Sequence, residues 1–169
     1  MTSKLLLMFL LIVSPVWPLG DNPLVGDPYV VVNKATNEMA YIVGGKVDKV
    51  YKVATGRTED LTPEGEFSIV VKAKNPYYRK KNIEGGVKEN PLGTRWIGFD
   101  ADGTDGRIYG IHGNNNPASI GQHITGGCVR MFNEEVEDLF LKIPYGAKVF
   151  ITTTDKDFVT LGKEKGAIE

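Results

Sequence analysis

The chain has 169 residues and a formal net charge of −1, with 20 Lys and Arg against 21 Asp and Glu. A chain of this length predicts one domain, which buries about two-thirds of the surface of the unfolded chain. The charges nearly cancel and no basic stretch is interleaved with aromatic residues, so nucleic acid is not expected as a partner.

The first residues have the character of an export signal. Lys4 is followed by an unbroken apolar run from Leu5 to Val13 and then by a proline-containing stretch that ends at Gly20. A positive end before a short apolar core is typical of a signal peptide, because a membrane-spanning helix needs about 20 apolar residues. We expect residues 1–20 to direct export. An uncleaved membrane anchor and a hydrophobic strand of the fold are the alternatives.

Three short strands are predicted in the first part of the domain. Tyr29–Asn33 is rich in β-branched residues. In Met39–Val43, positions 39, 41 and 43 alternate with Ala40 and Ile42, and Val47–Thr55 follows a turn at Gly44-Gly45. Polar turn residues at 34–37 separate the first two. Strands at this short spacing are typical of an antiparallel β-meander.

The next strand leads into a long segment without a clear period. The turn Thr62-Pro63-Glu64-Gly65 introduces the predicted strand Glu66–Ala73, and residues 74–92 follow it. A connection of this length inside a compact domain is usually a lid, a binding loop or a mobile segment. Its Tyr77-Tyr78 pair and Arg79-Lys80-Lys81 cluster could contact a sugar–peptide polymer that bears carboxylates. The alternative is a solvated loop whose charges serve solubility.

A hairpin then brings a histidine to a strand end. The predicted strands Trp96–Asp100 and Arg107–Ile111 flank residues 102–106, which hold two Asp/Gly turn formers. His112 follows the second strand directly. The hairpin therefore predicts that His112 lies at the edge of the sheet.

The connection after His112 contains one short helical turn and a second histidine. Asn116 and Pro117 form a helix start, with residues 118–121 as a single turn. No acid or second metal ligand stands at a useful spacing from His123, and a zinc site needs three or four ligands. We therefore expect His123 to be a surface or local structural residue, and we predict no metal.

The last predicted elements are a helix, a strand and a polar tail. Asn133 is the expected N-cap of the helix, whose apolar positions recur at helical spacing at Val136, Leu139, Phe140 and Ile143. The strand Ala147–Thr152 follows, and residues 154–169 are expected to form a loosely held tail. The elements together predict a mostly β domain, with antiparallel sheets in a sandwich-like arrangement and one or two short helices packed on them.

The single cysteine is the first candidate for chemistry. An exported chain whose only cysteine is Cys128 cannot form an internal disulfide, so the thiol is reactive, pairs with another molecule, or is buried and inert. A cysteine attacks as the thiolate, and His112 is the better placed of the two histidines to take its proton. This pair favours the nucleophile over the inert residue.

The residues around Cys128 suit a thiol that approaches a substrate. Gly126 and Gly127 allow the backbone to pass close to a substrate and leave amide N–H groups for a developing oxyanion. They could equally serve only a tight turn. Arg130, two residues past the cysteine, points to the same side if the chain is extended. It could clamp a substrate carboxylate or hold the cysteine loop through a salt bridge.

The stretch from Tyr109 to Met131 resembles the signature of the L,D-transpeptidases of the YkuD type. That signature is a histidine, a connecting segment, and then Ser/Thr-His-Gly-Cys, and the matching positions here are His112, Thr125, Gly126, Gly127 and Cys128. The residue two before the cysteine, often histidine in the family, is Gly126. Similarity extends to Thr62–Phe67 and Asn90–Arg95, and so covers nearly all of the chain after the leader.

The resemblance implies a catalytic domain over residues 27–153 that needs no cofactor. Cys128 would attack the carbonyl of the third residue of a peptidoglycan stem tetrapeptide, release D-alanine, and pass the acyl group to an amine. His112 would be the base and the carbonyl of Gly113 would orient it. The oxyanion and substrate-binding residues would be Gly126, Gly127, Arg130 and Tyr109.

The resemblance also implies a place and an inhibitor class. The enzyme would act outside the cytoplasm at a bacterial cell wall, and carbapenem-type β-lactams would label its thiol. Contact with a membrane would come only through an uncleaved anchor. Three alternatives remain open at this point: an L,D-carboxypeptidase with water as acceptor, a cysteine peptidase acting on wall peptides, and a wall-binding module without catalysis.

Overall fold

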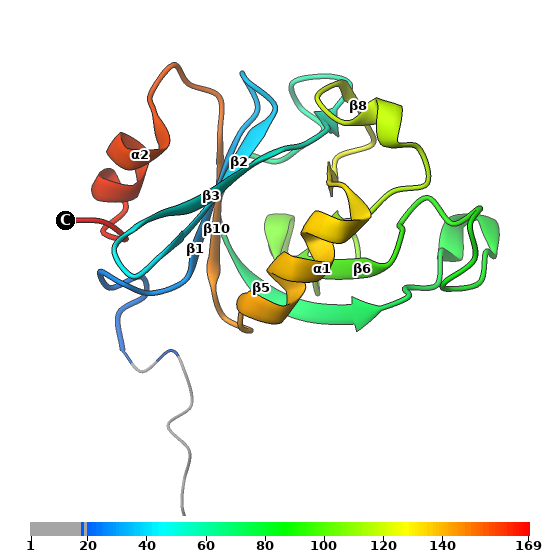
Figure 1. Ribbon diagram of the computed structural model, residues 1–169, viewed down its shortest axis with the longest axis horizontal. Coiled ribbons are helices and arrows are strands. Elements are labelled where there is room, and N and C mark those ends of the chain that lie inside the picture. Colours follow the sequence, from blue (N-terminus) through cyan, green and yellow to red (C-terminus); the bar gives the residue numbers. More distant parts are fainter. Residues whose placement is uncertain (1–17, 19) are drawn as a thin grey trace, which may run out of the picture.

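The computed structural model describes residue 18 and residues 20–169, so nearly all of the expected leader lies outside the described residues. An eight-stranded sheet has the order β3-β2-β1-β10-β5-β6-β7-β9, and β4 pairs with β8 in a small second sheet (Figure 1). The strands are β1 Tyr29–Asn33, β2 Glu38–Val43, β3 Lys46–Lys52, β4 Thr55–Gly56, β5 Gly65–Lys74, β6 Arg95–Phe99, β7 Tyr109–His112, β8 His123–Thr125, β9 Val129–Arg130 and β10 Lys148–Thr152. The helices are α1 Asn133–Lys142 and α2 Phe158–Glu164, with 3₁₀ turns η1 Arg79–Lys81, η2 Ala101–Gly103 and η3 Pro117–Ser119.

The predicted mostly β fold is confirmed, but the sheet is mixed rather than purely antiparallel. The expected meander forms as β1, β2 and β3, each antiparallel to the next. Strand β10 runs parallel to β1, and β9 runs parallel to β7. In each parallel pair a long stretch of chain separates the two strands, residues 34–147 between β1 and β10 and residues 113–128 between β7 and β9. Sequence spacing alone did not reveal these crossovers, because a parallel pair has no turn signal between its strands.

Strand β5 joins the two halves of the sheet. Its first residues pair with β10, from Gly65 to Ser68, and the segment from Ile69 to Lys74 pairs with β6. The register shifts between Ile69 and Val71, at the point where β5 passes from one neighbour to the other. Such an irregularity bends a strand, so the sheet curls around its core (Figure 1).

The main core lies between the curled sheet and α1. Alternate residues of β1 divide between two clusters, with Val30 and Val32 in the main core and Tyr29 and Val31 on the opposite face. The predicted apolar face of α1 is present, because Val136 and Leu139 are fully buried in the same main core. The β6–β7 half of the sheet, which carries His112, is thereby fixed to α1.

The expected N-cap of α1 is corrected by the structure. Phe132 holds the cap position without a side-chain hydrogen bond, and Asn133 is the first residue of the helix. The Asn133 side chain instead turns to the segment that follows β7, where it accepts from the N–H of Asn114 at 3.0 Å and donates to its carbonyl at 3.0 Å. A tertiary contact has replaced the local cap.

The expectation of a loosely held C-terminal tail is wrong. Residues 158–164 form α2, whose N-cap Asp157 accepts from the Thr160 N–H at 2.8 Å. Leu161, Ala167 and Ile168 pack on the outer face of β1 and β2. The many charged residues around these few apolar ones obscured the pattern. Of the helices in the described part of the chain, none is long and apolar enough to span a membrane.

Candidate active site

The parallel pairing of β7 with β9 brings the cysteine to the histidine. Ile111 is paired with Val129 and His112 with Arg130. Cys128 immediately precedes this paired segment, so it lies beside the strand that ends at His112. Residues 113–127 leave this sheet and return, so Cys128 and His112, which are distant in sequence, come to two neighbouring strands.

His112 is buried and its ring orientation is fixed by the next peptide unit. The side chain is 4% exposed, and Nδ1 lies 2.7 Å from the carbonyl oxygen of Gly113. A carbonyl only accepts hydrogen bonds, so Nδ1 carries the proton and Nε2 is the unprotonated nitrogen of the neutral ring. Burial, and then the positive charge of Arg130, lower the pKa of His112 to about 4, against smaller opposing effects of the Gly113 and Leu92 carbonyls. The ring is therefore a neutral base near pH 7.

Trp96 covers one face of the His112 ring. It is paired with His112 across β6 and β7, and the two rings stack with centroids 5.7 Å apart and planes at 15°. The indole Nε1 donates to the carbonyl of Gly106 at 2.8 Å, which fixes the indole in turn. The sequence analysis placed Trp96 only at the start of a strand. Its position opposite the histidine depends on strand register, which no local pattern reveals.

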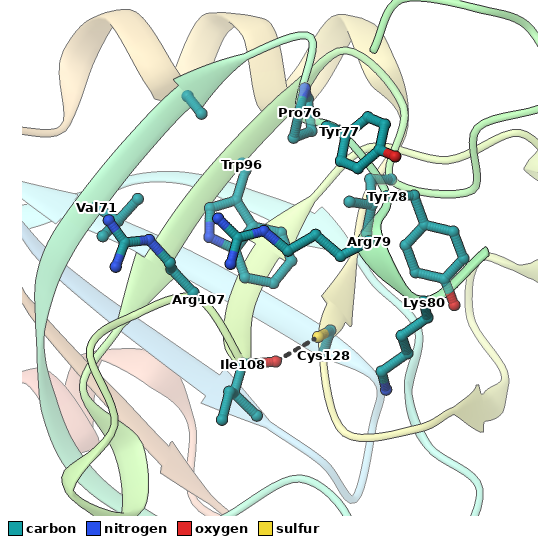
Figure 2. Close-up of a pocket in the computed structure, with 12 residues that line it drawn as sticks. Val71, Pro76, Tyr77, Tyr78, Arg79, Lys80, Trp96, Arg107, Ile108 and Cys128 are labelled. Carbon is teal, nitrogen blue, oxygen red and sulfur yellow. Dashed lines mark hydrogen bonds between the residues drawn. The ribbon is translucent and has the colours of Figure 1, made fainter. Parts of the chain in front are cut away.

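Cys128 is half-buried at the head of β9. Its thiol donates to the carbonyl of Ile108 at 3.4 Å (Figure 2). Burial raises the pKa of Cys128, while the Gly110 N–H and the charges of Lys80 and Arg130 act in the lowering direction. A raised thiol pKa and a lowered imidazole pKa together make the resting pair neutral rather than a thiolate–imidazolium pair.

The two glycines before the cysteine have different surroundings. Gly127 has φ +128°, and a Cβ there would lie 2.3 Å from the carbonyl oxygen of Leu61, whereas Gly126 has open space around it. The Thr125 hydroxyl accepts from the Gly127 N–H at 3.2 Å and donates to the Cys128 carbonyl at 2.7 Å. The Gly127 N–H is thus engaged within the cysteine loop rather than free for an oxyanion. Thr125 is the residue that ties this loop together.

Arg130 is tied to a hydroxyl rather than to an acid. Its guanidinium donates from Nη1 to Ser119 Oγ at 3.0 Å, and its Nε is buried without a hydrogen-bond partner. The ion pairs found among the described residues all involve other cations. The salt bridge that was one predicted role of Arg130 is therefore not formed. Its role as a carboxylate clamp stays a prediction.

Tyr109 and His123 lie at the margins of this arrangement. Tyr109 stacks on Phe99 with centroids 6.5 Å apart, and Asp102, its hydrogen-bond partner, adds to the burial that raises the pKa of Tyr109. His123 is exposed, with Nδ1 3.2 Å from Thr55 Oγ1. In the part of the chain that the structure describes, no three His, Cys, Asp or Glu side chains are grouped as metal ligands.

A pocket of about 270 Å³ opens in front of Cys128. Much of its wall comes from residues 76–80 in the long segment that has no period in the sequence (Figure 2). Asn90 folds this segment, since its side-chain amide donates to the carbonyls of Pro76 at 2.8 Å and Glu84 at 3.0 Å. The lining residues are Val71, Ala73, Pro76, Tyr77, Tyr78, Arg79, Lys80, Leu92, Trp96, Arg107, Ile108 and Cys128.

The chain that follows His112 is held from behind by Asn133. Its Oδ1 also accepts from the Thr94 N–H at 3.3 Å, so one side chain joins the residue before β6, the segment after His112 and α1. A Cβ on Gly113 would lie 2.1 Å from that oxygen, which explains why glycine stands at this position. The Gly113 carbonyl that orients His112 therefore has its own support. The sequence analysis assigned Asn133 only a capping role and missed this one.

Comparison with known proteins points to one family. Residues 27–151 match the family model of the L,D-transpeptidase catalytic domain, YkuD. The chain is 62% identical over 158 residues to the Bacillus subtilis L,D-transpeptidase YqjB, covering 94% of this chain and 90% of that protein. It is 35% identical over 130 residues to YkuD of B. subtilis, covering 74% of this chain and 69% of the relative.

Solved structures share the fold. The catalytic domain of the Enterococcus faecium L,D-transpeptidase, in a form acylated by ertapenem, superposes with a TM-score of 0.56 at 23% identity, over 76% of this chain and 98% of that one. The chain spans 50% of the length of a longer L,D-transpeptidase structure from E. faecium.

Proposed function

The chain belongs to the YkuD family of L,D-transpeptidase catalytic domains, and we propose that it cross-links peptidoglycan stem peptides with Cys128 as nucleophile. The resemblance seen in residues 109–131 is thereby confirmed, and the protein is an enzyme of this class. The observation that supports the proposed mechanism is the parallel pairing of β7 with β9, because Cys128 directly precedes β9 and the buried, neutral His112 ends β7.

Acylation begins with proton transfer between two neutral groups. Cys128 leaves the Ile108 carbonyl, its proton passes to Nε2 of His112, and Sγ forms a bond to the carbonyl carbon of the donor's third residue. The carbonyl oxygen takes up the electron pair as an oxyanion. When the oxyanion collapses, the C–N bond to the terminal D-alanine breaks and His112 protonates the leaving amine. The product is a thioester on Cys128 and free D-alanine.

Transfer to the acceptor reverses these roles. An amine on a second stem peptide attacks the thioester carbonyl and gives a proton to His112, the C–S bond breaks, and the proton returns to Cys128. Throughout both steps the Gly113 carbonyl and the Trp96 indole hold the imidazole in one orientation. Water in place of the amine would make the same machinery an L,D-carboxypeptidase.

The cellular location is part of the proposal. The positive end and apolar core of residues 4–13 support export, and a substrate in the cell wall requires it. We place the enzyme outside the cytoplasm of a bacterial cell, in contact with the wall through its catalytic domain.

Intact-protein mass spectrometry tests the mechanism. The full-length chain is mixed with a disaccharide tetrapeptide, next to Cys128→Ala and His112→Ala, and free D-alanine is assayed in the same tubes. We expect an acyl adduct and D-alanine release with the unchanged chain alone, and an amine acceptor should then convert the adduct into cross-linked product. Turnover that survives in either folded variant would overturn the assignment, and hydrolysis that ignores added amine would favour the carboxypeptidase.

Carbapenems provide a second probe of the thiol. One related catalytic domain has been solved in an ertapenem-acylated form. A cysteine that is acylated by a stem peptide should also open the strained ring here, so we expect one covalent adduct on the unchanged chain and none on Cys128→Ala. An unchanged mass after prolonged incubation would count against the proposed nucleophile.

A further inference from the structure

The pocket in front of Cys128 is lined by cations and by no acid. Among its lining residues Arg79, Lys80 and Arg107 are the charged ones, and the rest are apolar, aromatic or the thiol itself. Figure 2 shows the Arg79 side chain crossing in front of Trp96, the Arg107 guanidinium at the Val71 side of the pocket, and Lys80 nearer Cys128. Positive charge is thus concentrated where the donor must lie, although the chain as a whole has a net charge of only −1.

These cations are largely available to a ligand. Arg107 is paired with Asp105 at 2.6 Å, but both side chains are more than half exposed, and such a surface pair is weak. Neither Arg79 nor Lys80 takes part in an ion pair among the described residues. Lys80 lines the same pocket as Cys128, and its positive charge acts on the pKa of the thiol in the lowering direction.

Arg79 and Arg107 line the same pocket, and two positive charges in one pocket repel each other less when an anion is bound between them. A carboxylate is the natural occupant, because its two oxygens match the planar fork of arginine. A stem tetrapeptide donor offers a carboxylate in two places. One is the C-terminus of its fourth residue, and the other is on the side chain of the third residue where that diamino acid carries a free acid.

We propose that Arg79 and Arg107 form a carboxylate-binding site that makes the enzyme selective for donors bearing a free carboxylate beside the scissile bond. The inference rests on the proposed function and deepens it by naming the substrate class. Lys80 adds to the attraction from the side of the thiol. Amidation of the bound carboxylate removes its charge and replaces an acceptor oxygen by a donor, which faces the guanidinium groups unfavourably.

The test compares matched donors on matched variants. The donors are a tetrapeptide with both carboxylates free, one amidated on the third residue's side chain, one amidated at the C-terminus, and one with lysine at the third position. The variants are Arg79→Gln, Arg107→Gln and, as control, Lys81→Gln. Lys81 is the exposed neighbour of Lys80 in the same 3₁₀ turn and does not line the pocket.

For the free donor we expect kcat/KM to fall about tenfold or more in Arg79→Gln and Arg107→Gln, as for loss of a hydrogen bond to a charged group, and to stay unchanged in Lys81→Gln. The unchanged enzyme should discriminate against one amidated donor by a similar factor, and Arg79→Gln should lose that discrimination. The donor whose amidation matters identifies the carboxylate. If activity is lost only with the lysine donor and the side-chain amidated donor, the carboxylate that is bound is the one on the side chain of the third residue.

Two outcomes would overturn the inference. Equal turnover of all four donors by the unchanged enzyme would show that no carboxylate is selected, and equal effects of Arg79→Gln and Lys81→Gln would reduce the cations to surface charge. Alkylation by neutral iodoacetamide distinguishes failure of this inference from failure of the proposed transpeptidase activity. If Cys128 is alkylated but no donor acylates it, the proposed transpeptidase activity fails and the selectivity inference falls with it.

Discussion

Trp96 and His112 form a stacked pair, with ring centroids 5.7 Å apart, that belongs to two neighbouring strands of the sheet. The stack covers a face of the base that the Gly113 carbonyl cannot restrain, because that carbonyl acts along the ring edge. We expect Trp96→Leu to lower kcat at least tenfold and to cost about 2 to 4 kcal/mol of stability through the cavity it leaves. Steady-state kinetics and urea unfolding measure the two effects.

Trp96→Phe is the control for that substitution. Phenylalanine retains an aromatic face but loses the hydrogen bond from Nε1 to the Gly106 carbonyl. A smaller loss of kcat than in Trp96→Leu would show that the stack positions the base. Equal losses in the two variants would instead assign the effect to the Gly106 contact.

The buried neutral state of His112 predicts how stability depends on pH. Its pKa is about 4 in the folded chain against an ordinary value of 6.5, so between these values the unfolded state binds more protons. The contribution of His112 to the free energy of unfolding is fully present above pH 6.5. It is lost as the pH falls towards 4, and the loss is about 3 kcal/mol. Urea unfolding at pH 7 and pH 5 should show a larger loss for the unchanged chain than for His112→Gln. Parallel losses would contradict the shift.

The pKa values of His112 and Cys128 together predict the pH profile of kcat/KM. If a neutral thiol and a neutral imidazole react, the acid limb follows His112 and lies well below pH 6.5, and the alkaline limb follows the raised pKa of Cys128. The result is a broad plateau through neutrality. A profile that rises with an apparent pKa near 6.5 would indicate that the imidazole is more exposed in solution than its 4% exposure here implies.

Gly126 and Gly127 differ in what a methyl group would meet. Gly127→Ala places Cβ 2.3 Å from the Leu61 carbonyl at φ +128°, so we expect it to cost about 1 to 3 kcal/mol and to displace the thiol. Gly126→Ala meets open space and should change stability by less than about 0.5 kcal/mol. Thermal melts and iodoacetamide alkylation rates distinguish them. A stable Gly127→Ala with normal alkylation would remove the structural reason for this glycine.

The sequence predicted those parts of the site that depend on residue type, and missed those that depend on register. Cys128 and His112 were singled out by residue type, and the hairpin before His112 was predicted from its turn residues and is present as β6 and β7. The stack of Trp96 on His112 and the hydrogen bonds of Asn133 could not be predicted. Each joins elements that are distant in sequence, and no fixed sequence spacing indicates such a contact. The α2 helix was missed for a different reason, since its few apolar residues stand among charged ones.

Replacing Asn133 should affect His112 indirectly, through the backbone segment that orients the imidazole. Its side chain makes hydrogen bonds to Thr94 and to both backbone groups of Asn114, so Asn133→Ala should cost about 2 kcal/mol or more. It should also lower kcat, because the Gly113 segment that orients His112 loosens. Asn133→Asp keeps the acceptor oxygen and loses the donor. Its stability and its kcat should both lie between those of the unchanged chain and of Asn133→Ala. Full activity in a destabilised Asn133→Ala would limit the residue to a structural role.

The final prediction concerns α2, far along the sheet from Cys128. Leu161 is 3% exposed and packs with Ile42 and Ile168, whereas Val159 on the same helix is 47% exposed. We expect Leu161→Ala to cost about 2 to 4 kcal/mol and Val159→Ala to cost less than about 0.5 kcal/mol. Because α2 packs on β1 and β3 rather than on the strands that carry the site, both variants should retain kcat at temperatures where they are folded. Equal urea midpoints for the two variants would mean that the C-terminal segment is held loosely in solution, whereas the expected gap would establish it as part of the domain's hydrophobic core.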